Sequence, residues 1–269
     1  MIRSLSIGLV LSMAMTLSCN AQNASRIEVA WNSAAPLSVV DSTIRAKASL
    51  PSPRQVQQNV EQRLQDVLSP EMAANFGLFI YVSKAESGPW AQRMYVFQKA
   101  GDDLLLLYDW PVSTGRETVE ADAQGAELPT TTPAGFYELD PKRFLEHYRS
   151  VQWNEPMPYA MFFNWVDHGT PTGLAIHGTE ESNEGLLGMR ASAGCVRLST
   201  QNARTLFALI RGNFRGDAPK FGYDKYTNSI MNNGLLLHDA TGKLVMAPGF
   251  SALVYIDEFG GTNLEARAY

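Results

Sequence analysis

Cys195 lies in a short segment whose residue types suit a cysteine nucleophile. Small residues precede the thiol in the order Ser192-Ala193-Gly194-Cys195, and Arg197 follows two positions later. Small side chains let a substrate carbonyl approach the backbone, and consecutive N–H groups in such a turn can hold a developing oxyanion. The positive potential of Arg197 favours the thiolate. The alternative interpretation is a buried, inert thiol, since free cysteines are among the most buried residue types.

A cysteine nucleophile needs a general base, and the chain has four histidines for this role. His177 follows the apolar run 174–176, which predicts a strand end that can hold an imidazole rigidly. His168 begins the same tripeptide, His-Gly-Thr, but it lies just before Pro171 and is predicted to occupy a turn. A lone histidine is more often structural than catalytic, so the prediction for His177 depends on its pairing with Cys195.

The composition excludes several classes of protein. Hydrophobic residues make up 45% and charged residues 18% of the 269 residues, which is enough apolar material for a folded core. Lys and Arg number 22 against 27 Asp and Glu, so no basic surplus exists to neutralise the phosphates of a nucleic acid. Two cysteines are too few for a disulfide scaffold or a four-cysteine zinc site, and no His-Glu-x-x-His spacing occurs. We therefore expect no metal, no other cofactor and no nucleic-acid partner.

The N-terminal residues are typical of an export signal. The stretch 4–18 carries no charge and is too short for a membrane-spanning helix, which needs about 20 residues. The residues before Cys19 resemble a lipoprotein box, which predicts removal of 1–18 and a lipidated Cys19 that alone contacts the membrane. Removal of 1–21 by ordinary signal peptidase and an uncleaved apolar anchor stay open as alternatives. Each predicts an exported protein of the periplasm or cell envelope, and 19–51 is then an Ala- and Ser-rich tether.

The remaining chain predicts a mixed, β-dominated domain with a few helices. Ser52-Pro53-Arg54-Gln55 matches a capping box with Pro at the first helical position, which predicts a helical appendage over 52–76. Another helix is predicted to begin at a cap on Ser199 or Thr200 and to end at Gly212. Apolar runs predict strands over 78–82, 93–98, 104–110, 135–139, 159–165, 174–176 and 252–256. Residues 115–131 are predicted to form a surface loop, and 213–247 an irregular segment.

The residues around His177 and Cys195 resemble the catalytic domain of the L,D-transpeptidases, the YkuD-like family. The family signature is His-Gly-Thr, a loop and then Ser-x-Gly-Cys-x-Arg, and the spacing from His177 to Cys195 fits it, whereas that from His168 does not. Three further motifs stand in the family order: Pro111-Val112-Ser113-Thr114-Gly115, Thr132-Pro133-Ala134-Gly135-Phe136 and Met157-Pro158-Tyr159.

The motifs cover about 77–211 and imply the family's β-sandwich or barrel. We therefore expect a catalytic domain over 77–256 that includes 213–247 as an insertion, followed by a tail over 257–269. The insertion is interpreted as a lid over the cleft, a contact for a partner or a segment without consequence.

The resemblance implies a cysteine acyl-transfer site that acts on peptidoglycan stem peptides. Cys195 attacks the bond between the third-position diamino acid and the following D-Ala, and His177 takes the thiol proton. A carbonyl just after the histidine, here that of Gly178, orients the imidazole. The thioester then passes its acyl group to an amine acceptor.

The same resemblance gives roles to the residues around this pair. The backbone N–H groups around Gly194 and Cys195 bind the oxyanion. Ser192 and Arg197 brace the loop or meet a substrate carboxylate. Two residues of the third motif, Met157 and Tyr159, line or support the cleft.

One departure leaves the acceptor open, because Ala193 stands where many family members have a second histidine. With water as acceptor, the enzyme is an L,D-carboxypeptidase, or an amidase that cleaves a cross-link or a wall-attached protein. A wall-anchored protein is also an alternative acceptor for transfer. The alternative from another class is a catalytically silent peptidoglycan-binding module in which Cys195 is buried.

Overall fold

The structure is a computed structural model that describes residues 52–261. The predicted signal sequence, Cys19 and the tether over 19–51 lie outside the described residues, as does 262–269 of the tail. The described part contains three α-helices and sixteen strands, so the predicted mixed, β-dominated fold class is confirmed. No helix within residues 52–261 is long and apolar enough to cross a membrane.

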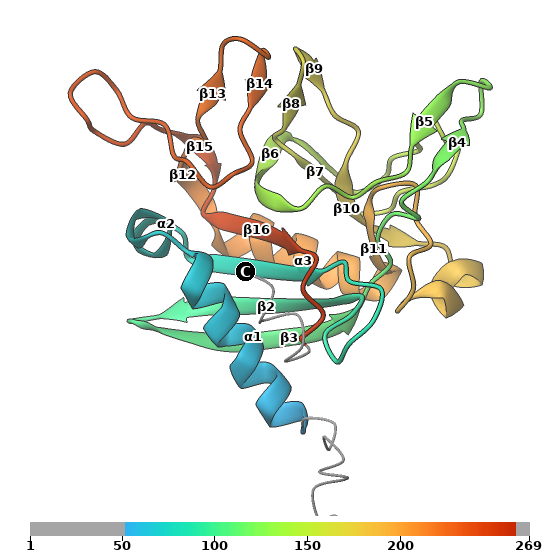
Figure 1. Ribbon diagram of the computed structural model, residues 1–269, viewed down its shortest axis with the longest axis horizontal. Helices are drawn as coiled ribbons and strands as arrows, with labels where there is room; N and C mark the ends of the chain where they lie inside the picture. The colour runs from blue at the N-terminus through green and yellow to red at the C-terminus, as the bar shows by residue number, and fades with distance from the viewer. Residues whose placement is uncertain (1–51, 262–269) are drawn as a thin grey trace, which may run out of the picture. The chain divides into compact units, whose positions relative to one another are not determined.

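The elements form one large sheet, four small ribbons and the helices that cover them (Figure 1). The helices are α1 (Pro53–Val67), α2 (Pro70–Asn75) and α3 (Thr200–Asn213), with a 3-10 helix at Glu181–Leu186. The large sheet contains β1 (Leu78–Ser83), β2 (Arg93–Ala100), β3 (Asp103–Pro111), β6 (Gly135–Leu145), β7 (Ala160–Phe163), β10 (Ala175–Thr179), β11 (Val196–Ser199) and β16 (Ala252–Asp257). The ribbons pair β4 (Val119–Ala121) with β5 (Glu127–Pro129), β8 (Val166–Asp167) with β9 (Thr170–Pro171), β12 (Arg215–Pro219) with β15 (Met246–Phe250), and β13 (Tyr223–Asp224) with β14 (Ser229–Ile230).

The large sheet runs in the order β11-β10-β7-β6-β16-β1-β2-β3 and nearly closes on itself. Its two edges meet just beyond the end of β3. There the Ser113 N–H donates to the Arg197 carbonyl oxygen at 3.0 Å, and the Arg197 N–H donates to the Ser113 carbonyl oxygen at 2.8 Å. This pairing satisfies backbone groups that an open edge would leave without partners. It also brings the motif segments 111–115 and 192–197 side by side.

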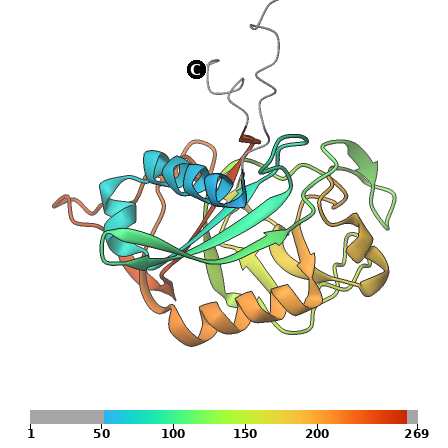
Figure 2. The ribbon, with the colours of Figure 1, turned by 90° about the horizontal axis from the view of Figure 1, so that it is seen from below.

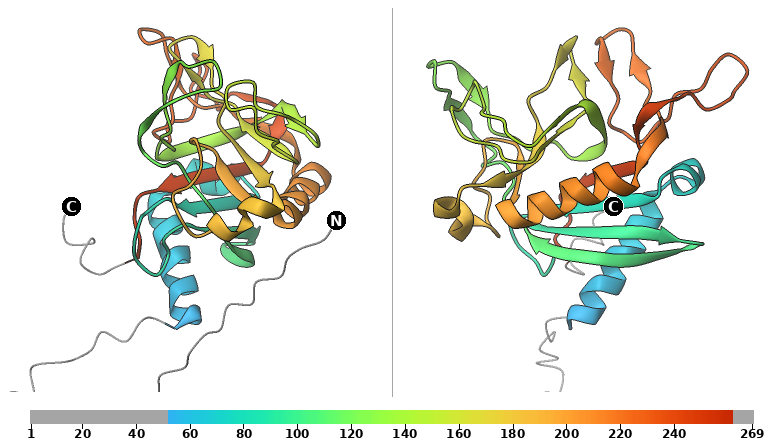
Figure 3. Two further views of the ribbon diagram at one scale, coloured as in Figure 1. Left: turned by 90° about the vertical axis from the view of Figure 1, so that its right-hand side faces the viewer. Right: turned by 180° about the vertical axis from the view of Figure 1, so that it is seen from behind.

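Apolar side chains leave the sheet on both faces and form two cores. Leu78 and Ile80 of β1 belong to the same buried cluster as Leu206 of α3, whereas Phe79 belongs to a second cluster with Leu64 of α1. This alternation follows from the pleat of a strand and explains why every residue of β1 is buried. Figures 2 and 3 show α1 and α3 on opposite faces of the sheet.

Helix α1 begins at the predicted capping box. The Ser52 hydroxyl oxygen accepts from the Gln55 N–H at 3.3 Å, and the Gln55 side-chain oxygen accepts from the Ser52 N–H at 3.0 Å. Val60 and Leu64 are buried on the inner face of the helix. The helix is therefore fixed both by its own cap and by the core beneath it.

The predicted end of α3 is wrong by one residue. Ser199 caps its start, since the Ser199 hydroxyl oxygen accepts from the Asn202 N–H at 3.2 Å. The helix continues through Gly212 to Asn213, because Gly212 does not adopt the left-handed conformation of a glycine cap. The helix ends instead where Phe214, 9% exposed, turns into the core.

Two segments predicted to lack regular structure contain short strands. Residues 115–131 hold the ribbon β4–β5, and 213–247 hold β12, β13 and β14. Both predictions failed for the same reason: these strands carry few buried apolar residues, and Arg215, Gly216 and Asp217 of β12 are all exposed. The buried carboxylate of Glu138 on β6 holds the second segment in place by accepting from the Phe221 N–H at 2.8 Å and from Lys220.

Replacement of Leu64 by alanine tests whether α1 belongs to the cooperative fold. Leu64 is 1% exposed, so Leu64→Ala should lower the free energy of unfolding by about 2–5 kcal/mol through lost burial and a cavity. The neighbouring exposed residue supplies the matched control, and Gln65→Ala should change stability by less than about 0.5 kcal/mol. Urea unfolding followed by circular dichroism measures both values, and equal effects of the two variants would contradict the packing of α1.

Candidate active site

Adjacent parallel strands bring His177 and Cys195 to one cavity. Strands β10 and β11 pair in a register that sets Ile176 opposite Val196 and His177 opposite Arg197. Side chains alternate along strands, so Ile176 and Val196 enter the core while His177 and Arg197 point to the other face. Cys195 directly precedes β11, two positions from Arg197, and therefore shares that face. All three polar side chains line a cavity of about 280 Å³.

Backbone contacts on both sides hold the His177 imidazole. Its Nδ1 lies 2.7 Å from the Gly178 carbonyl oxygen, which can only accept, so Nδ1 carries the proton and Nε2 is left as a base. The Gly178 N–H donates to the Pro158 carbonyl oxygen at 2.8 Å. A Cβ at position 178 would lie 2.9 Å from the Thr200 backbone, so only glycine fits between His177 and the start of α3. The side chain of His177 is itself buried, at 3% exposure.

The Cys195 thiol is partly exposed to the cavity. Its sulfur donates to the Gly173 carbonyl oxygen at 3.6 Å. Among the described residues no hydrogen bond joins this thiol to His177. In unliganded enzymes such contacts are often long and tighten when substrate binds, so the absence of this hydrogen bond does not exclude a pairing of the two side chains.

Burial sets the resting charges of both groups. Desolvation lowers the pKa of His177 from 6.5 to about 4, although the hydrogen bond to Gly178 opposes it. Desolvation raises the pKa of the Cys195 thiol from 9.0 to about 11, and the Ala175 backbone and Arg197 oppose it less strongly. Arg197 acts in the predicted direction, toward the thiolate, but desolvation outweighs it. At neutral pH the cavity holds a neutral thiol and a neutral imidazole.

Ser192 and Gly194 shape the turn before the nucleophile. The Ser192 hydroxyl donates to the Cys195 carbonyl oxygen at 2.5 Å and accepts from the Gly194 N–H at 3.0 Å. Gly194 has φ +114°, and a Cβ there would lie 2.9 Å from the Thr131 carbonyl oxygen. Because Ser192 occupies the Gly194 N–H, the Cys195 N–H is the donor left for an oxyanion in this turn; no hydrogen bond of the described residues uses it.

Thr132 links its own motif, 132–136, to the motif 111–115 and to the turn before Cys195. Its hydroxyl donates to the Gly194 carbonyl oxygen at 2.7 Å, and its oxygen accepts from the Gly115 N–H at 2.7 Å. Ser192 meets the same segment, 111–115, since its N–H donates to the Thr114 carbonyl oxygen at 2.9 Å. Motifs far apart in the sequence therefore meet in one buried network behind the nucleophile.

Comparison with known families identifies this arrangement. The family described as the L,D-transpeptidase catalytic domain, YkuD, matches residues 79–243, which is more than half of the chain. The chain belongs to this family. The match also includes most of 213–247, which lies outside the sequence motifs.

Several solved structures resemble the chain at low sequence identity. An L,D-transpeptidase from Xylanimonas cellulosilytica is 16% identical, covers 68% of this chain and 61% of its own, and has a TM-score of 0.38. An L,D-transpeptidase from Mycobacterium tuberculosis is 17% identical, and the match covers 68% of this chain and 58% of that one with a TM-score of 0.35. The helical cell shape determining protein Pgp2 from Campylobacter jejuni is 13% identical, and the match covers 72% of this chain and 54% of that one with a TM-score of 0.37. The match thus spans about three fifths or less of these solved chains, and no curated protein sequence matches this L,D-transpeptidase domain.

The structure brings Met157 and Arg197 to the cavity of this L,D-transpeptidase domain but not Tyr159. Met157 is 4% exposed and lines the cavity while packing in a small core with Phe162. Tyr159 is not among the lining residues. Its backbone has φ +54°, and its ring packs on Phe207 of α3 with ring centres 5.7 Å apart.

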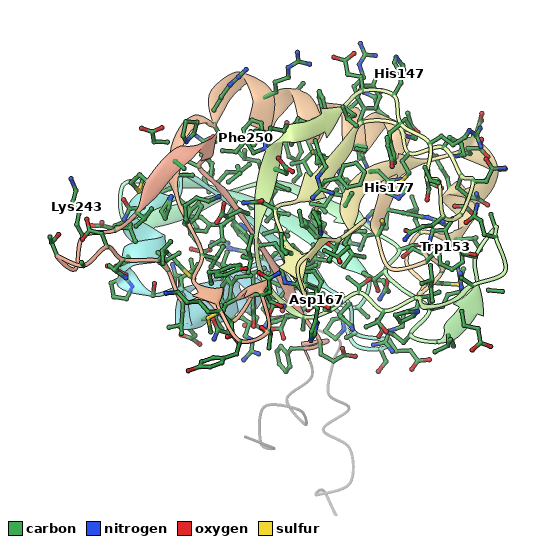
Figure 4. All side chains as sticks on the ribbon, turned by 90° about the horizontal axis from the view of Figure 1, so that it is seen from above. His147, Trp153, Asp167, His177, Lys243 and Phe250 are labelled. Atoms are coloured by element: carbon green, nitrogen blue, oxygen red, sulfur yellow. The ribbon has the colours of Figure 1, made fainter. Side chains whose placement is uncertain are left out.

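The remaining histidines lie elsewhere in the described domain. His168 is exposed in the turn between β8 and β9, as predicted, and His238 contacts Glu71 at 2.9 Å. Figure 4 shows His147 at the outer edge, away from His177. Within residues 52–261 no three His, Cys, Asp or Glu side chains lie together in a way that could hold a metal ion.

Several cavity residues escaped the sequence analysis. Trp153 and Glu155 come from the segment between β6 and β7, Asp167 comes from β8, and Gly173 contributes the carbonyl that meets the thiol. Figure 4 shows Trp153 and Asp167 on segments that flank His177. Only Trp153 and Glu155 had a sequence signal that could have pointed to the cavity, namely their position just before the Met157 motif. Ala193 also lines the cavity, so its methyl group stands where many L,D-transpeptidases carry an imidazole.

Alkylation of Cys195 by iodoacetamide tests the neutral resting pair. With a thiol pKa of about 11, the alkylation rate should keep rising tenfold per pH unit through pH 9.5. The shift from 9.0 to about 11 corresponds to about 10²-fold less thiolate at neutral pH than in an unperturbed cysteine. The same cysteine in urea-unfolded protein is the control, and its rate should level off near pH 9. Mass spectrometry of the Cys195 peptide gives both rates. A folded-state rate that levels off below pH 9 would instead indicate a thiolate–imidazolium pair.

Loss of the Thr132 hydroxyl tests the buried network. Thr132→Val leaves the Gly115 N–H and the Gly194 carbonyl without this partner, so the free energy of unfolding should fall by about 1–3 kcal/mol. Thr205→Val is the matched control, since its hydroxyl bonds a helix carbonyl near solvent, and its effect should stay below about 0.5 kcal/mol. Denaturant unfolding of the two variants gives the comparison, and equal stabilities would argue against the role of Thr132.

Proposed function

We propose that this protein is a cell-envelope L,D-transpeptidase that acts on peptidoglycan stem peptides through Cys195 and His177. The observation that carries the proposal is a single cavity lined by the only described thiol and by an imidazole whose Nδ1 is fixed by a backbone carbonyl. Family membership supports the reaction class. The predicted export signal, either 1–18 followed by a lipidated Cys19 or 1–21, supports the location.

The first half-reaction forms a thioester. The Cys195 thiol gives its proton to Nε2 of His177 while the sulfur bonds to the carbonyl carbon between the diamino acid and D-Ala. The resulting oxyanion accepts from the Cys195 N–H, whose position Ser192 and Gly194 fix. The C–N bond then breaks, the imidazolium returns its proton to the departing amine, and free D-Ala leaves.

The second half-reaction transfers the acyl group to an amine. Nε2 of His177 takes a proton from the acceptor amine as its nitrogen attacks the thioester, and Cys195 leaves as the thiol once the proton is returned. A second cavity of about 330 Å³ shares Gln152, Met157 and Gly173 with the first, which supports room for a second peptide beside the acyl-enzyme. The lowered pKa of His177, about 4, keeps Nε2 unprotonated at physiological pH and therefore free to accept the proton in both half-reactions.

Paired substitutions test the catalytic roles. Cys195→Ala and His177→Ala should each lower the rate of turnover of tetrapeptide stems by at least about 10³-fold, because each removes a group that acts in the transition state. His168→Ala is the matched control, since it lies in the same His-Gly-Thr tripeptide but in an exposed turn, and it should keep wild-type activity. Circular dichroism establishes that all three variants fold.

Mass spectrometry of the products separates the reactions. Cross-linked dimers or exchange of the terminal D-amino acid are expected for transfer, whereas shortened stems alone would identify an L,D-carboxypeptidase. Turnover retained by Cys195→Ala would overturn the proposed nucleophile. Absence of any turnover by the wild-type protein, with stems bound, would identify a silent peptidoglycan-binding module.

A further inference from the structure

An ion pair lies in the wall of the cavity, close to the nucleophile. Nη2 of Arg197 contacts a carboxylate oxygen of Glu155, and both residues line the cavity with Cys195 and His177. The Arg197 side chain is only 9% exposed, whereas that of Glu155 is 47% exposed. The Arg197 guanidinium is thus buried in the domain, whereas the Glu155 carboxylate contacts it from the solvent-exposed side.

A buried guanidinium requires an anion, because a desolvated charge without a partner is strongly unfavourable. Glu155 supplies that anion from the segment between β6 and β7. The backbone of this segment is held by its own contacts, including the Ser150 N–H to the Glu155 carbonyl oxygen at 2.8 Å and a bridge between Arg149 and Pro156. Rotation of the Glu155 side chain is therefore enough to release Arg197, and the segment need not move.

Arg197 stays in place when Glu155 leaves. Its backbone is fixed in the seam of the sheet by Ser113, and its Nη1 donates to the Ala191 carbonyl oxygen at 3.3 Å. A guanidinium presents a planar fork that fits a carboxylate with two parallel hydrogen bonds. Once Glu155 has turned away, the cavity offers a fixed site for a carboxylate from another molecule.

The distance between Arg197 and Cys195 determines which carboxylate of a stem peptide can reach the guanidinium. Cys195 and Arg197 are two residues apart on one face, which separates their Cα atoms by about 6–7 Å. In a stem tetrapeptide the terminal carboxylate of the leaving residue lies three bonds from the carbonyl carbon that Cys195 attacks. A carboxylate this close to the scissile bond can reach Arg197 while the carbonyl lies at the sulfur.

We propose that Glu155 is an internal stand-in for the substrate carboxylate: it occupies Arg197 in the empty cavity and is displaced by the α-carboxylate of the leaving residue. The proposal rests on the proposed function for the identity of the ligand. When the leaving residue departs, Glu155 returns to Arg197 and opposes rebinding of the free amino acid. Glu155 thus determines which peptides enter and favours forward reaction.

Alkylation of Cys195 by two reagents of similar size tests this exchange without any peptidoglycan. Iodoacetate carries a carboxylate, and iodoacetamide carries a neutral amide in its place. The ratio of their rates measures how well the cavity accepts a carboxylate near Cys195. Because both reagents attack the same thiolate, a change in the thiol pKa cancels in the ratio.

Glu155→Gln should raise the iodoacetate-to-iodoacetamide ratio about tenfold over the wild-type protein, since Arg197 gains a free fork without losing much volume nearby. Glu146→Gln is the matched control. Glu146 also pairs with an arginine, Arg211, at 2.9 Å and begins the same segment, but it does not line the cavity. Its ratio should equal that of the wild-type protein. Glu155→Ala repeats the test with a different side chain, and thermal unfolding establishes that each variant folds.

An unchanged ratio in both Glu155 variants would overturn the proposal. A second measurement addresses the substrate: Glu155→Gln should lower KM about tenfold for a tetrapeptide stem with a terminal carboxylate and leave KM unchanged for the same stem with a terminal amide. Equal effects on both stems would also overturn it. If neither stem is turned over, the proposed function fails, while the alkylation ratio still decides whether Glu155 competes for Arg197.

Discussion

The backbone pairing of Ser113 with Arg197 is the interaction on which the rest of the site depends. It joins the two edges of the eight-stranded sheet, so strands at opposite ends of the strand order meet at one seam. The seam brings Gly115 to the turn before Cys195, where the Thr132 hydroxyl links it to Gly194. A nucleophile on an open edge would have none of these neighbours. Here the nucleophile turn is held from behind by a closed backbone network.

Buried polar side chains reinforce that seam from the opposite side. The Lys84 ammonium donates to the Thr132 carbonyl oxygen at 2.6 Å and pairs with Glu117 at 2.8 Å. The Gln92 side chain accepts from the Thr114 N–H at 2.9 Å and donates to the Lys84 carbonyl oxygen at 2.9 Å. Each of these groups is costly to bury alone, and together they are satisfied in one arrangement of the motif loops. Geometry at the nucleophile is therefore set by groups that never reach the cavity.

The sequence allowed prediction of the parts of the site that depend on local pattern. His177 ends an apolar run and Cys195 lies in a small-residue turn, and the resemblance of their spacing to the L,D-transpeptidase signature paired the two. Glu155 could not be found this way, because its meeting with Arg197 depends on how the segment after β6 folds, which residue types do not reveal. The carbonyl of Gly173 carries no side-chain signal. The ring of Tyr159 points to α3 because of a left-handed backbone that residue type does not reveal. Strands such as β12 were missed because apolar alternation marks only strands that face a core.

The neutral state of the Cys195 thiol also bears on how long the enzyme survives. Peroxides and disulfides react with thiolates far faster than with thiols, so a cysteine held protonated in its empty cavity resists oxidation. A thiolate–imidazolium pair would be a permanent target for such oxidants. Burial of His177 and desolvation of Cys195 keep the reactive thiolate scarce in the empty cavity. The low polarity that keeps the Cys195 thiol protonated is thus also its protection against chemical ageing.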